Sequence, residues 1–265
     1  MAIRKGYVDC SAGQLHYRTS AGPGTPIVFF QQTASSSKMY IKVMERLAGH
    51  RAMFAFDTPG FGESFDPSTQ PTMVQYADWL REGIDRLGLQ RFHIFGHHTG
   101  ACLAVELAVR HAARVASIMM VGPVPLTPDE RRQFSRQFGA PIAPTADGSY
   151  LQTTWDYLRD LGAHGDLALH HRELVDTTRA FVGRSMAYRA VWEQDWTALY
   201  RQVKCPMLLL CAEDDVLFPY FARAQELRPD AWAAVLKGAN FEPDLDPDGT
   251  VNSIRQFLAT LRDNN

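Results

Sequence analysis

The sequence predicts an α/β domain in which a mostly parallel sheet carries helices on both faces, and three observations predict it. Short apolar runs with strand character alternate with amphipathic helical stretches along most of the chain, as in repeated strand–helix–strand units. The strand signal disappears between residues 123 and 196 and then resumes. An apolar strand that ends at Phe95 runs through a glycine-bounded turn into a helix rich in small residues.

The part of the chain before residue 123 contains the first expected strands and helices. Residues 14–18 alternate between polar and apolar side chains, as in a strand with one exposed face. Residues 26–30 are continuously apolar, which is typical of a strand covered on both faces, and the following strands share this pattern. Helices are expected where apolar or small residues recur at helical spacing. In order, the expected elements are strand 14–18, strand 26–30, helix 39–47, strand 52–56, helix 74–87, strand 92–95, helix 99–109 and strand 115–121.

Residues 123–196 are expected to form a helical cap inserted into a core domain of residues 1–122 and 197–265. Thr127 is a favourable N-cap, Pro128 suits the first helical position, and two acidic residues follow in the first turn. The rest of the segment reads as further helices rich in aromatic residues and arginine. Beyond the cap, strand 206–210, helix 218–227, strand 232–236 and helix 251–261 complete the expected core.

Charge and composition argue against several classes of partner. The net charge is −2, which gives no electrostatic reason to expect nucleic acid or an anionic membrane. No apolar run reaches the roughly 18 residues of a transmembrane helix, and the N-terminal segment lacks the apolar core of a signal peptide, so we expect a cytoplasmic protein. The cysteines and histidines show no metal-ligand spacing, so neither a metal nor an organic cofactor is expected.

The turn after strand 92–95 has the sequence Gly96-His97-His98-Thr99-Gly100. A residue in a strained turn requires glycine two positions away on either side, because side chains there would clash. This spacing between a strand and a helix is the pattern of a nucleophile elbow. The sequence therefore predicts that His98 occupies the position of a nucleophile.

With this turn in place, the chain resembles the α/β-hydrolase superfamily over nearly its whole length. Residues 57–64 resemble the family's D-x-x-G-x-G-x-S loop. The resemblance implies that Asp215 is the acid of the catalytic triad. It also implies that Asn240, seven residues before Pro247, stands where the family has the triad histidine. The order elbow, acid, base matches the order of the family.

The departures from the family pattern argue against ordinary serine esterase chemistry. The elbow serine is replaced by His98, the base histidine by Asn240, and the His-Gly pair of the oxyanion loop by Gln31-Gln32. A serine mechanism needs a hydroxyl nucleophile and an imidazole to deprotonate it, and neither is in its place. Only Asp215 keeps its residue type.

Other parts of a hydrolase site are expected to remain. The resemblance implies that the backbone N–H groups of Thr33 and Thr99 form an oxyanion hole, an interaction worth about 3–4 kcal/mol per donor, with the amide of Gln32 as an additional donor. Members with a cap bind their ligand between cap and sheet, so cap aromatics should roof the pocket. The candidates for substrate binding are Gln31, Trp155 and Trp192.

We hypothesise that His98 acts as a general base, or as a nucleophile, on a small apolar or aromatic carbonyl compound, by hydrolysis or by C–C or C–X cleavage. Asp215 and Asn240 are its expected catalytic partners, and a homodimer is a further hypothesis. The alternatives are a catalytically inactive ligand-binding protein on the same fold and a cofactor-free oxygenase. If the protein is catalytically inactive, His98 is only a hydrogen-bonded polar residue in a site without activity, and Asp215 caps the helix that begins near residue 218.

Overall fold

The computed structural model describes residues 2–140 and 142–261, and the strands of this part of the chain form a single sheet of eight strands. The strand order is β1-β2-β4-β3-β5-β6-β7-β8, and every neighbouring pair from β4 to β8 is parallel, whereas β1–β2 and β2–β4 are antiparallel. The predicted α/β class is confirmed. The strands are β1 (Arg4–Cys10), β2 (Gly13–Ser20), β3 (Ile27–Phe30), β4 (Met53–Phe56), β5 (Phe92–His97), β6 (Val115–Val121), β7 (Met207–Ala212) and β8 (Trp232–Leu236).

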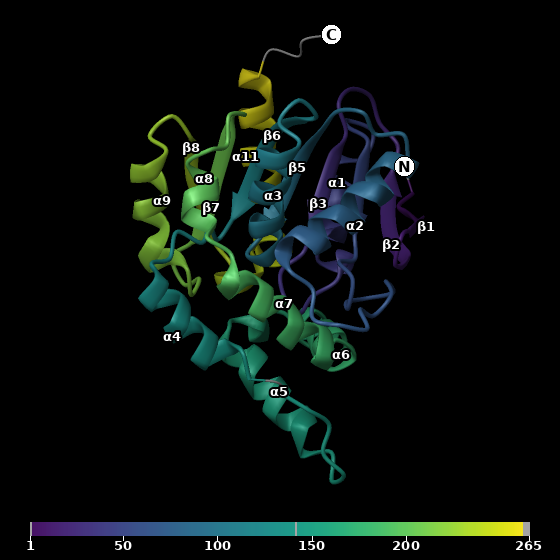
Figure 1. Cartoon of the computed structure of the whole chain (residues 1–265), viewed down its shortest axis with the longest axis vertical. Coiled ribbons are helices and arrows are strands. Elements are labelled where there is room, and N and C mark those ends of the chain that lie inside the picture. The colour runs from purple at the N-terminus through teal and green to yellow at the C-terminus, as the bar shows by residue number, and fades with distance from the viewer. Residues whose placement is uncertain (1, 141, 262–265) are drawn as a thin grey trace.

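Helices cover both faces of this sheet (Figure 1). On one face, α1 (Ile41–Leu47) and α11 (Pro247–Thr260) bury their apolar residues, and on the other face α2 (Met73–Arg86), α3 (Thr99–Arg110) and α9 (Phe221–Leu227) do so. The strands β3, β5 and β7 are buried along their whole length. This two-sided burial explains why these strands read as continuous apolar runs.

The first strand, β1, was not predicted from the sequence. β1 pairs with β2 at the edge of the sheet, and most of its side chains are exposed or half-buried. Because an edge strand of this kind buries little apolar surface, its sequence carries no apolar run. Two predicted helices also begin as 3-10 turns, η1 (Ser37–Tyr40) before α1 and η3 (Phe218–Tyr220) before α9.

The segment between β6 and β7 contains helices and no strand in its described part, as predicted. These helices are α4 (Pro128–Phe138), α5 (Ser149–Asp160), α6 (Leu167–Arg179), α7 (Phe181–Glu193) and α8 (Trp196–Tyr200), with the 3-10 turn η2 (Ala163–Gly165). In Figure 1, α4 to α7 lie beyond one end of the strands, and α5 projects farthest from the sheet. The predicted Thr127 cap is present as a capping box with Glu130. The division into core and cap stays a prediction.

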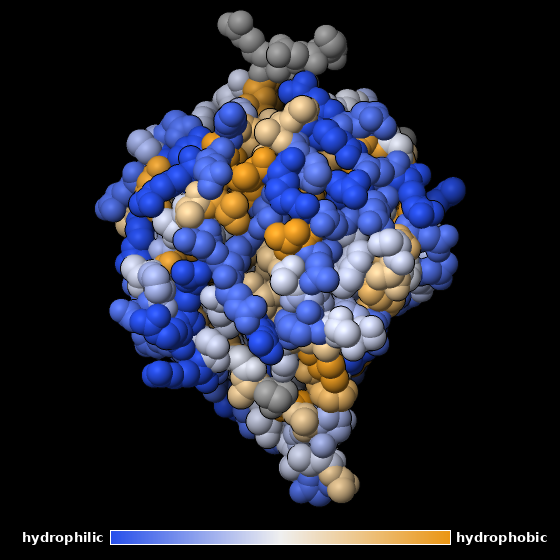
Figure 2. Space-filling model, viewed as in Figure 1, coloured by the Kyte–Doolittle hydropathy of each residue, from blue (hydrophilic) through white to orange (hydrophobic). Residues whose placement is uncertain are grey.

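Within the described residues, no helix combines the length and the apolar character needed to cross a bilayer. The face drawn in Figure 2 is largely hydrophilic, with apolar residues in small groups.

A buried aspartate holds the loop after β4 against the rest of the sheet. Asp57 accepts hydrogen bonds from Ser37 N (2.6 Å), Glu63 N (2.8 Å) and His16 Nδ1 (2.8 Å). A Cβ atom on Gly62, which has a φ of 53°, would lie 2.1 Å from the carboxylate, so only glycine fits there. Burial alone would raise the pKa of Asp57, but the hydrogen bonds from His16, Glu63 and Ser37 outweigh it and lower the pKa.

We expect Asp57→Asn to lower the free energy of unfolding at neutral pH by about 2 kcal/mol, because the amide cannot accept all of these hydrogen bonds. The pKa of Asp57 is lower in the folded chain than in the unfolded one, so its stabilising effect is present above roughly pH 4 and is lost as the pH falls through the folded value. Urea unfolding of both proteins across this range should show the difference shrinking with acid. The exposed Asp9 supplies a control, Asp9→Asn, and an equal effect of both variants would contradict the prediction.

Candidate functional site

The turn between β5 and α3 holds His98 in a strained backbone conformation. Its φ is 46° and its ψ is −103°, in a region that non-glycine residues rarely adopt. A Cβ atom on Gly96 would lie 2.2 Å from the carbonyl oxygen of Gly100, and one on Gly100 would lie 2.0 Å from that of Phe30. The steric reason predicted for the two glycines is therefore visible in the structure.

The imidazole of His98 reaches the predicted acid directly. Its Nε2 lies 2.7 Å from Oδ2 of Asp215, whose other oxygen accepts a hydrogen bond from Leu217 N at 2.6 Å. The Asp215 side chain is fully buried, whereas that of His98 is 16% exposed. A carboxylate at this distance favours the tautomer with the proton on Nε2. The lone pair is then on Nδ1.

A glycine from the next strand makes room for this imidazole. Gly122 follows β6, has a φ of 61°, and a Cβ atom on it would lie 2.1 Å from Cδ2 and 2.4 Å from Nε2 of His98. The ring thus lies directly against the Gly122 backbone. Gly122 was not predicted from the sequence as part of the site. Its only signal was a glycine at the end of an apolar strand.

The side chain of Asn240 forms a hydrogen bond with the loop that carries Asp215. Its Oδ1 accepts a hydrogen bond from Val216 N (3.2 Å), and its backbone carbonyl accepts one from Nε2 of Gln32 (2.9 Å). Its Nδ2 is buried and has no hydrogen-bond partner in the described part of the chain. Of the two expected catalytic partners of His98, Asp215 lies within hydrogen-bond distance of its imidazole, whereas the side chain of Asn240 hydrogen-bonds Val216.

The two threonines expected to supply the oxyanion hole lie side by side. The hydroxyl groups of Thr33 and Thr99 are 2.9 Å apart and hydrogen-bonded. Thr99 is the first residue of α3, so its N–H has no partner within the helix. The N–H of Thr33 donates to no carbonyl among the described residues. Gln32 uses its amide on the carbonyl of Asn240, so the expected additional donor is engaged by the protein itself.

A small cavity of ≈50 Å³ lies in front of these groups. It holds little more than a few water molecules, so a substrate is small or displaces side chains when it binds. Most of the wall is apolar or aromatic, and the polar groups gather on the side of the elbow. The lining residues are Gln32, Thr33, His98, Thr99, Val124, Phe134, Phe138, Tyr157, Leu161, Tyr188, Val191, Trp192, Val216, Leu217 and Asn240.

Two of the residues predicted to bind substrate lie elsewhere. Gln31 is buried against Thr58, whose N–H and hydroxyl lie 3.4 and 3.2 Å from its side-chain oxygen, and it does not line the cavity. Trp155 stacks on His170 with ring centroids 3.6 Å apart. The helix that carries Trp155 turns this face toward α6, and Trp155 is not among the residues that line the cavity. Trp192 does line the cavity.

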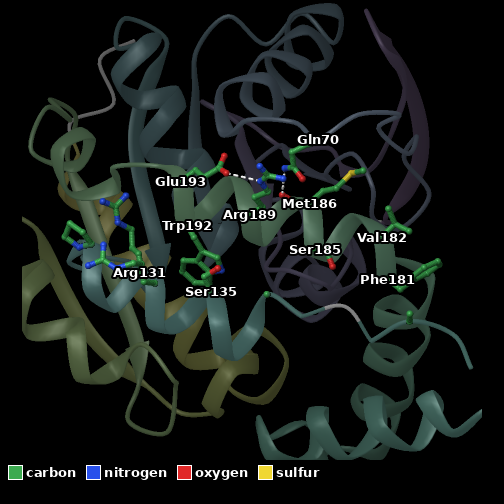
Figure 3. A pocket seen from close by; sticks show the side chains of 14 residues that line it. Gln70, Arg131, Ser135, Phe181, Val182, Ser185, Met186, Arg189, Trp192 and Glu193 are labelled. Atoms are coloured by element: carbon green, nitrogen blue, oxygen red, sulfur yellow. Dashed lines mark hydrogen bonds and ion pairs between the residues drawn. The ribbon is translucent and has the colours of Figure 1, made fainter.

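A second and larger hollow lies outside the cavity, between α4 and α7 (Figure 3). It measures ≈1010 Å³, and its wall includes Arg131, Ser135, Arg189 and Trp192. We call it the outer groove. Trp192 lines both the outer groove and the cavity, so its indole forms part of the wall between them.

We expect Trp192→Ala to join the outer groove to the cavity and to admit longer substrates. For a series of 4-nitrophenyl esters, the ratio of kcat/KM for the octanoate to that for the acetate should rise about tenfold, because apolar chain can then be buried in the groove. Trp155→Ala is the matched control, since that indole packs on His170 away from the cavity. An unchanged chain-length preference in Trp192→Ala would contradict this role of the indole.

Behind the His98–Asp215 pair lies a layer of buried ionisable groups. His97 is fully buried, and its Nε2 is 3.2 Å from Oε2 of the equally buried Glu242. His97, His98 and Asp215 offer ligand atoms that lie within 4.8 Å of one another, and so do Cys211, Asp215 and Glu242. The oxygens of Asp215, which belongs to both sets, already accept hydrogen bonds from His98 and Leu217, so we assign neither set as a metal site. Neither set was predicted from the sequence, because each combines residues from distant parts of the chain.

The comparisons with known proteins agree with this architecture. A family model described as alpha/beta hydrolase fold matches residues 25–228. The chain is 25% identical over 271 residues to a fluoroacetate dehalogenase of Burkholderia sp., with 91% of this chain and 89% of that protein covered. The structure of an enol-lactonase from Burkholderia xenovorans LB400 matches with a TM-score of 0.81 at 19% identity, covering 96% and 100% of the two chains. An esterase from Rhodococcus sp. ECU1013 matches with a TM-score of 0.80 at 22% identity, covering 98% and 100%.

Proposed function

Since the chain belongs to the α/β-hydrolase fold family, we propose that it is a hydrolase whose base is His98, oriented by Asp215, and whose substrate is a small apolar or aromatic carbonyl compound. The observation that carries the proposal is the 2.7 Å contact between Nε2 of His98 and Asp215. It leaves Nδ1 as the basic atom, in a residue that lines the cavity. The pair repeats the acid–base half of a catalytic triad with the imidazole moved to the elbow.

The proposed reaction is the hydrolysis of an ester or lactone. Nδ1 of His98 accepts a proton from a water molecule as the oxygen of that water attacks the substrate carbonyl. The N–H groups of Thr33 and Thr99 stabilise the negative charge on the carbonyl oxygen. When the tetrahedral intermediate collapses, the C–O bond breaks and the imidazolium returns the proton to the leaving oxygen. Asp215 stabilises the positive charge of the imidazolium in between.

Direct attack by Nδ1 on the carbonyl is the second route, with an acyl-imidazole as intermediate. Abstraction of an acidic C–H proton by the same nitrogen would expel a leaving group from the neighbouring carbon and break a C–X bond, and abstraction of an O–H proton would break a C–C bond in a retro-aldol step. The similarity to a dehalogenase and to an enol-lactonase supports a hydrolytic reaction on a small molecule. The unpartnered Nδ2 of Asn240 supports the proposal as well, because it is a buried donor at the cavity wall that a substrate oxygen would satisfy.

Turnover of a substrate panel tests the proposal. Purified protein is incubated with phenyl acetate, 4-nitrophenyl acetate and an aromatic enol lactone, with and without a serine-reactive phosphonate, and products and dissolved oxygen are followed. We expect hydrolysis that the phosphonate leaves intact. Recovery of every compound unchanged would favour the ligand-binding alternative, and oxygen consumption would favour the oxygenase. Loss of activity with the phosphonate would point to a hydroxyl nucleophile and overturn the role of His98.

A further inference from the structure

Glu242 is a buried carboxyl group that the proposed reaction does not use. It is the first residue of α10 (Glu242–Leu245) and is fully buried. Oε1 accepts a hydrogen bond from the N–H of Ala212 (3.1 Å), at the end of β7. Oε2 makes no hydrogen bond in the described part of the chain, although Nε2 of His97 lies 3.2 Å away.

No arginine or lysine side chain of the described residues forms an ion pair with Glu242. The ionisable groups that face it are His97 at the end of β5, Cys211 in β7, Asp215 in the following loop and Tyr40 in η1. An ionised Glu242 would thus place a second negative charge next to the carboxylate of Asp215. Two such charges in a buried site repel each other strongly, so one carboxyl retains its proton.

The environment indicates which carboxyl is neutral. Asp215 accepts hydrogen bonds on both oxygens, from His98 and from Leu217 N. Burial raises the pKa of Glu242 well above its usual range, and the charge of Asp215 raises it further. Burial also lowers the pKa of His97, as does the neighbouring His98. A neutral Glu242 and a neutral His97 therefore face each other.

We propose that Glu242 is a positioning residue for the His98–Asp215 pair, whose neutral carboxyl donates a hydrogen bond to Nε2 of His97 and accepts one from the backbone of Ala212. A small rotation of the His97 ring from the 3.2 Å contact completes the first bond. The carboxyl then satisfies two buried atoms that otherwise lack partners.

The contact of Glu242 with His97 acts on His98, and its contact with Ala212 acts on Asp215. The rings of His97 and His98 pack edge to face with centroids 4.4 Å apart, so holding the His97 ring limits where the His98 ring can lie. The N–H of Asp215 donates to the carbonyl of Ala212 (3.1 Å), so anchoring Ala212 fixes the start of the turn that carries the acid. The role in activity rests on the proposed function, whereas the neutral state of Glu242 does not.

The first test measures the neutral state through stability. Because the pKa of Glu242 is higher in the folded chain than in the unfolded one, folding of the wild type should weaken as the pH rises above about 4.3 toward the folded value. Glu242→Gln keeps the shape and cannot ionise. The Tm of this variant minus that of the wild type should increase by about 5 °C or more between pH 4.5 and pH 8.

The matched control is Glu106→Gln, which removes another buried carboxyl group, one that accepts a hydrogen bond from Gln194. We expect no comparable rise of the Tm difference with pH in Glu106→Gln, because the carboxyl group that is lost there accepts a hydrogen bond from the neutral amide of Gln194. A Tm difference for Glu242→Gln that stays flat or falls with rising pH would show that Glu242 is ionised in the folded chain and would overturn the proposal.

The second test measures positioning through activity. On a substrate that the wild type turns over, Glu242→Leu should lower kcat at least tenfold with little change in KM, and Glu242→Gln should restore most of kcat. An unchanged kcat in the leucine variant would show that Glu242 only fills space, and this would overturn the positioning role. If the leucine variant does not fold, the stability test on Glu242→Gln still decides. Absence of turnover in the wild type would refute the proposed function and leave that stability test intact.

Discussion

His98→Ala should lower kcat by about 1,000-fold or more on any compound that the wild-type chain hydrolyses, because a positioned general base contributes about 10²- to 10⁴-fold and no other imidazole among the described residues lines the cavity. The measurement is the rate of product formation at saturating substrate. Calorimetry measures ligand binding by the same variant. Binding should survive, since the aromatic wall is untouched. Full activity of this variant would end the mechanism.

Two further variants test whether residues 98 and 240 occupy the positions of the triad serine and histidine. His98→Ser alone should stay inactive, because residue 240 supplies no base for the hydroxyl group. The double variant His98→Ser with Asn240→His places serine, aspartate and histidine in the order of the family, and a serine-reactive phosphonate should label it. Labelling of the double variant but not of the single one would show that residues 98 and 240 stand at the two triad positions.

The architecture was readable from the sequence because its causes are local. The alternation of apolar runs and amphipathic stretches follows from a sheet covered on both faces. The elbow was readable for a similar reason, since Gly96 and Gly100 are required by backbone atoms within the turn or, in the case of Phe30, in the adjacent strand. Six of the predicted site residues line one cavity as a consequence. They are Gln32, Thr33, His98, Thr99, Trp192 and Asn240.

The direction of the His98 ring was not readable in this way. It depends on Gly122 and Asp215, which lie far along the chain and meet the ring only after the parallel strands align. The face that Trp155 turns inward is likewise decided by packing on His170 and not by helical spacing alone. Such pairings between distant residues leave no periodic signal, so the motif identified the residue at the elbow but not its partners.

Gly122→Ala is the second change from which we expect a large effect, and it acts on the same ring. The methyl group would overlap Cδ2 and Nε2 of His98, so the ring has to turn away from Asp215. A displacement of this kind should cost about 100-fold in kcat. The left-handed backbone adds a loss of roughly 1–2 kcal/mol in the free energy of unfolding. Steady-state kinetics and urea unfolding measure the two effects separately.

Gly88→Ala is the control that isolates the backbone contribution. Gly88 also has a positive φ, 75°, but nothing lies within 4 Å of an added Cβ. Gly88→Ala should lose only this backbone contribution and keep its kcat, whereas Gly122→Ala in the wild-type background should lose more, because it also displaces the imidazole. In a chain that already carries His98→Ala, Gly122→Ala should cost no more stability than Gly88→Ala, because no imidazole remains to be displaced. If Gly122→Ala lowered the free energy of unfolding by the same amount with and without the imidazole, the two residues would not interact. The position of the His98 ring against Gly122 would then be wrong.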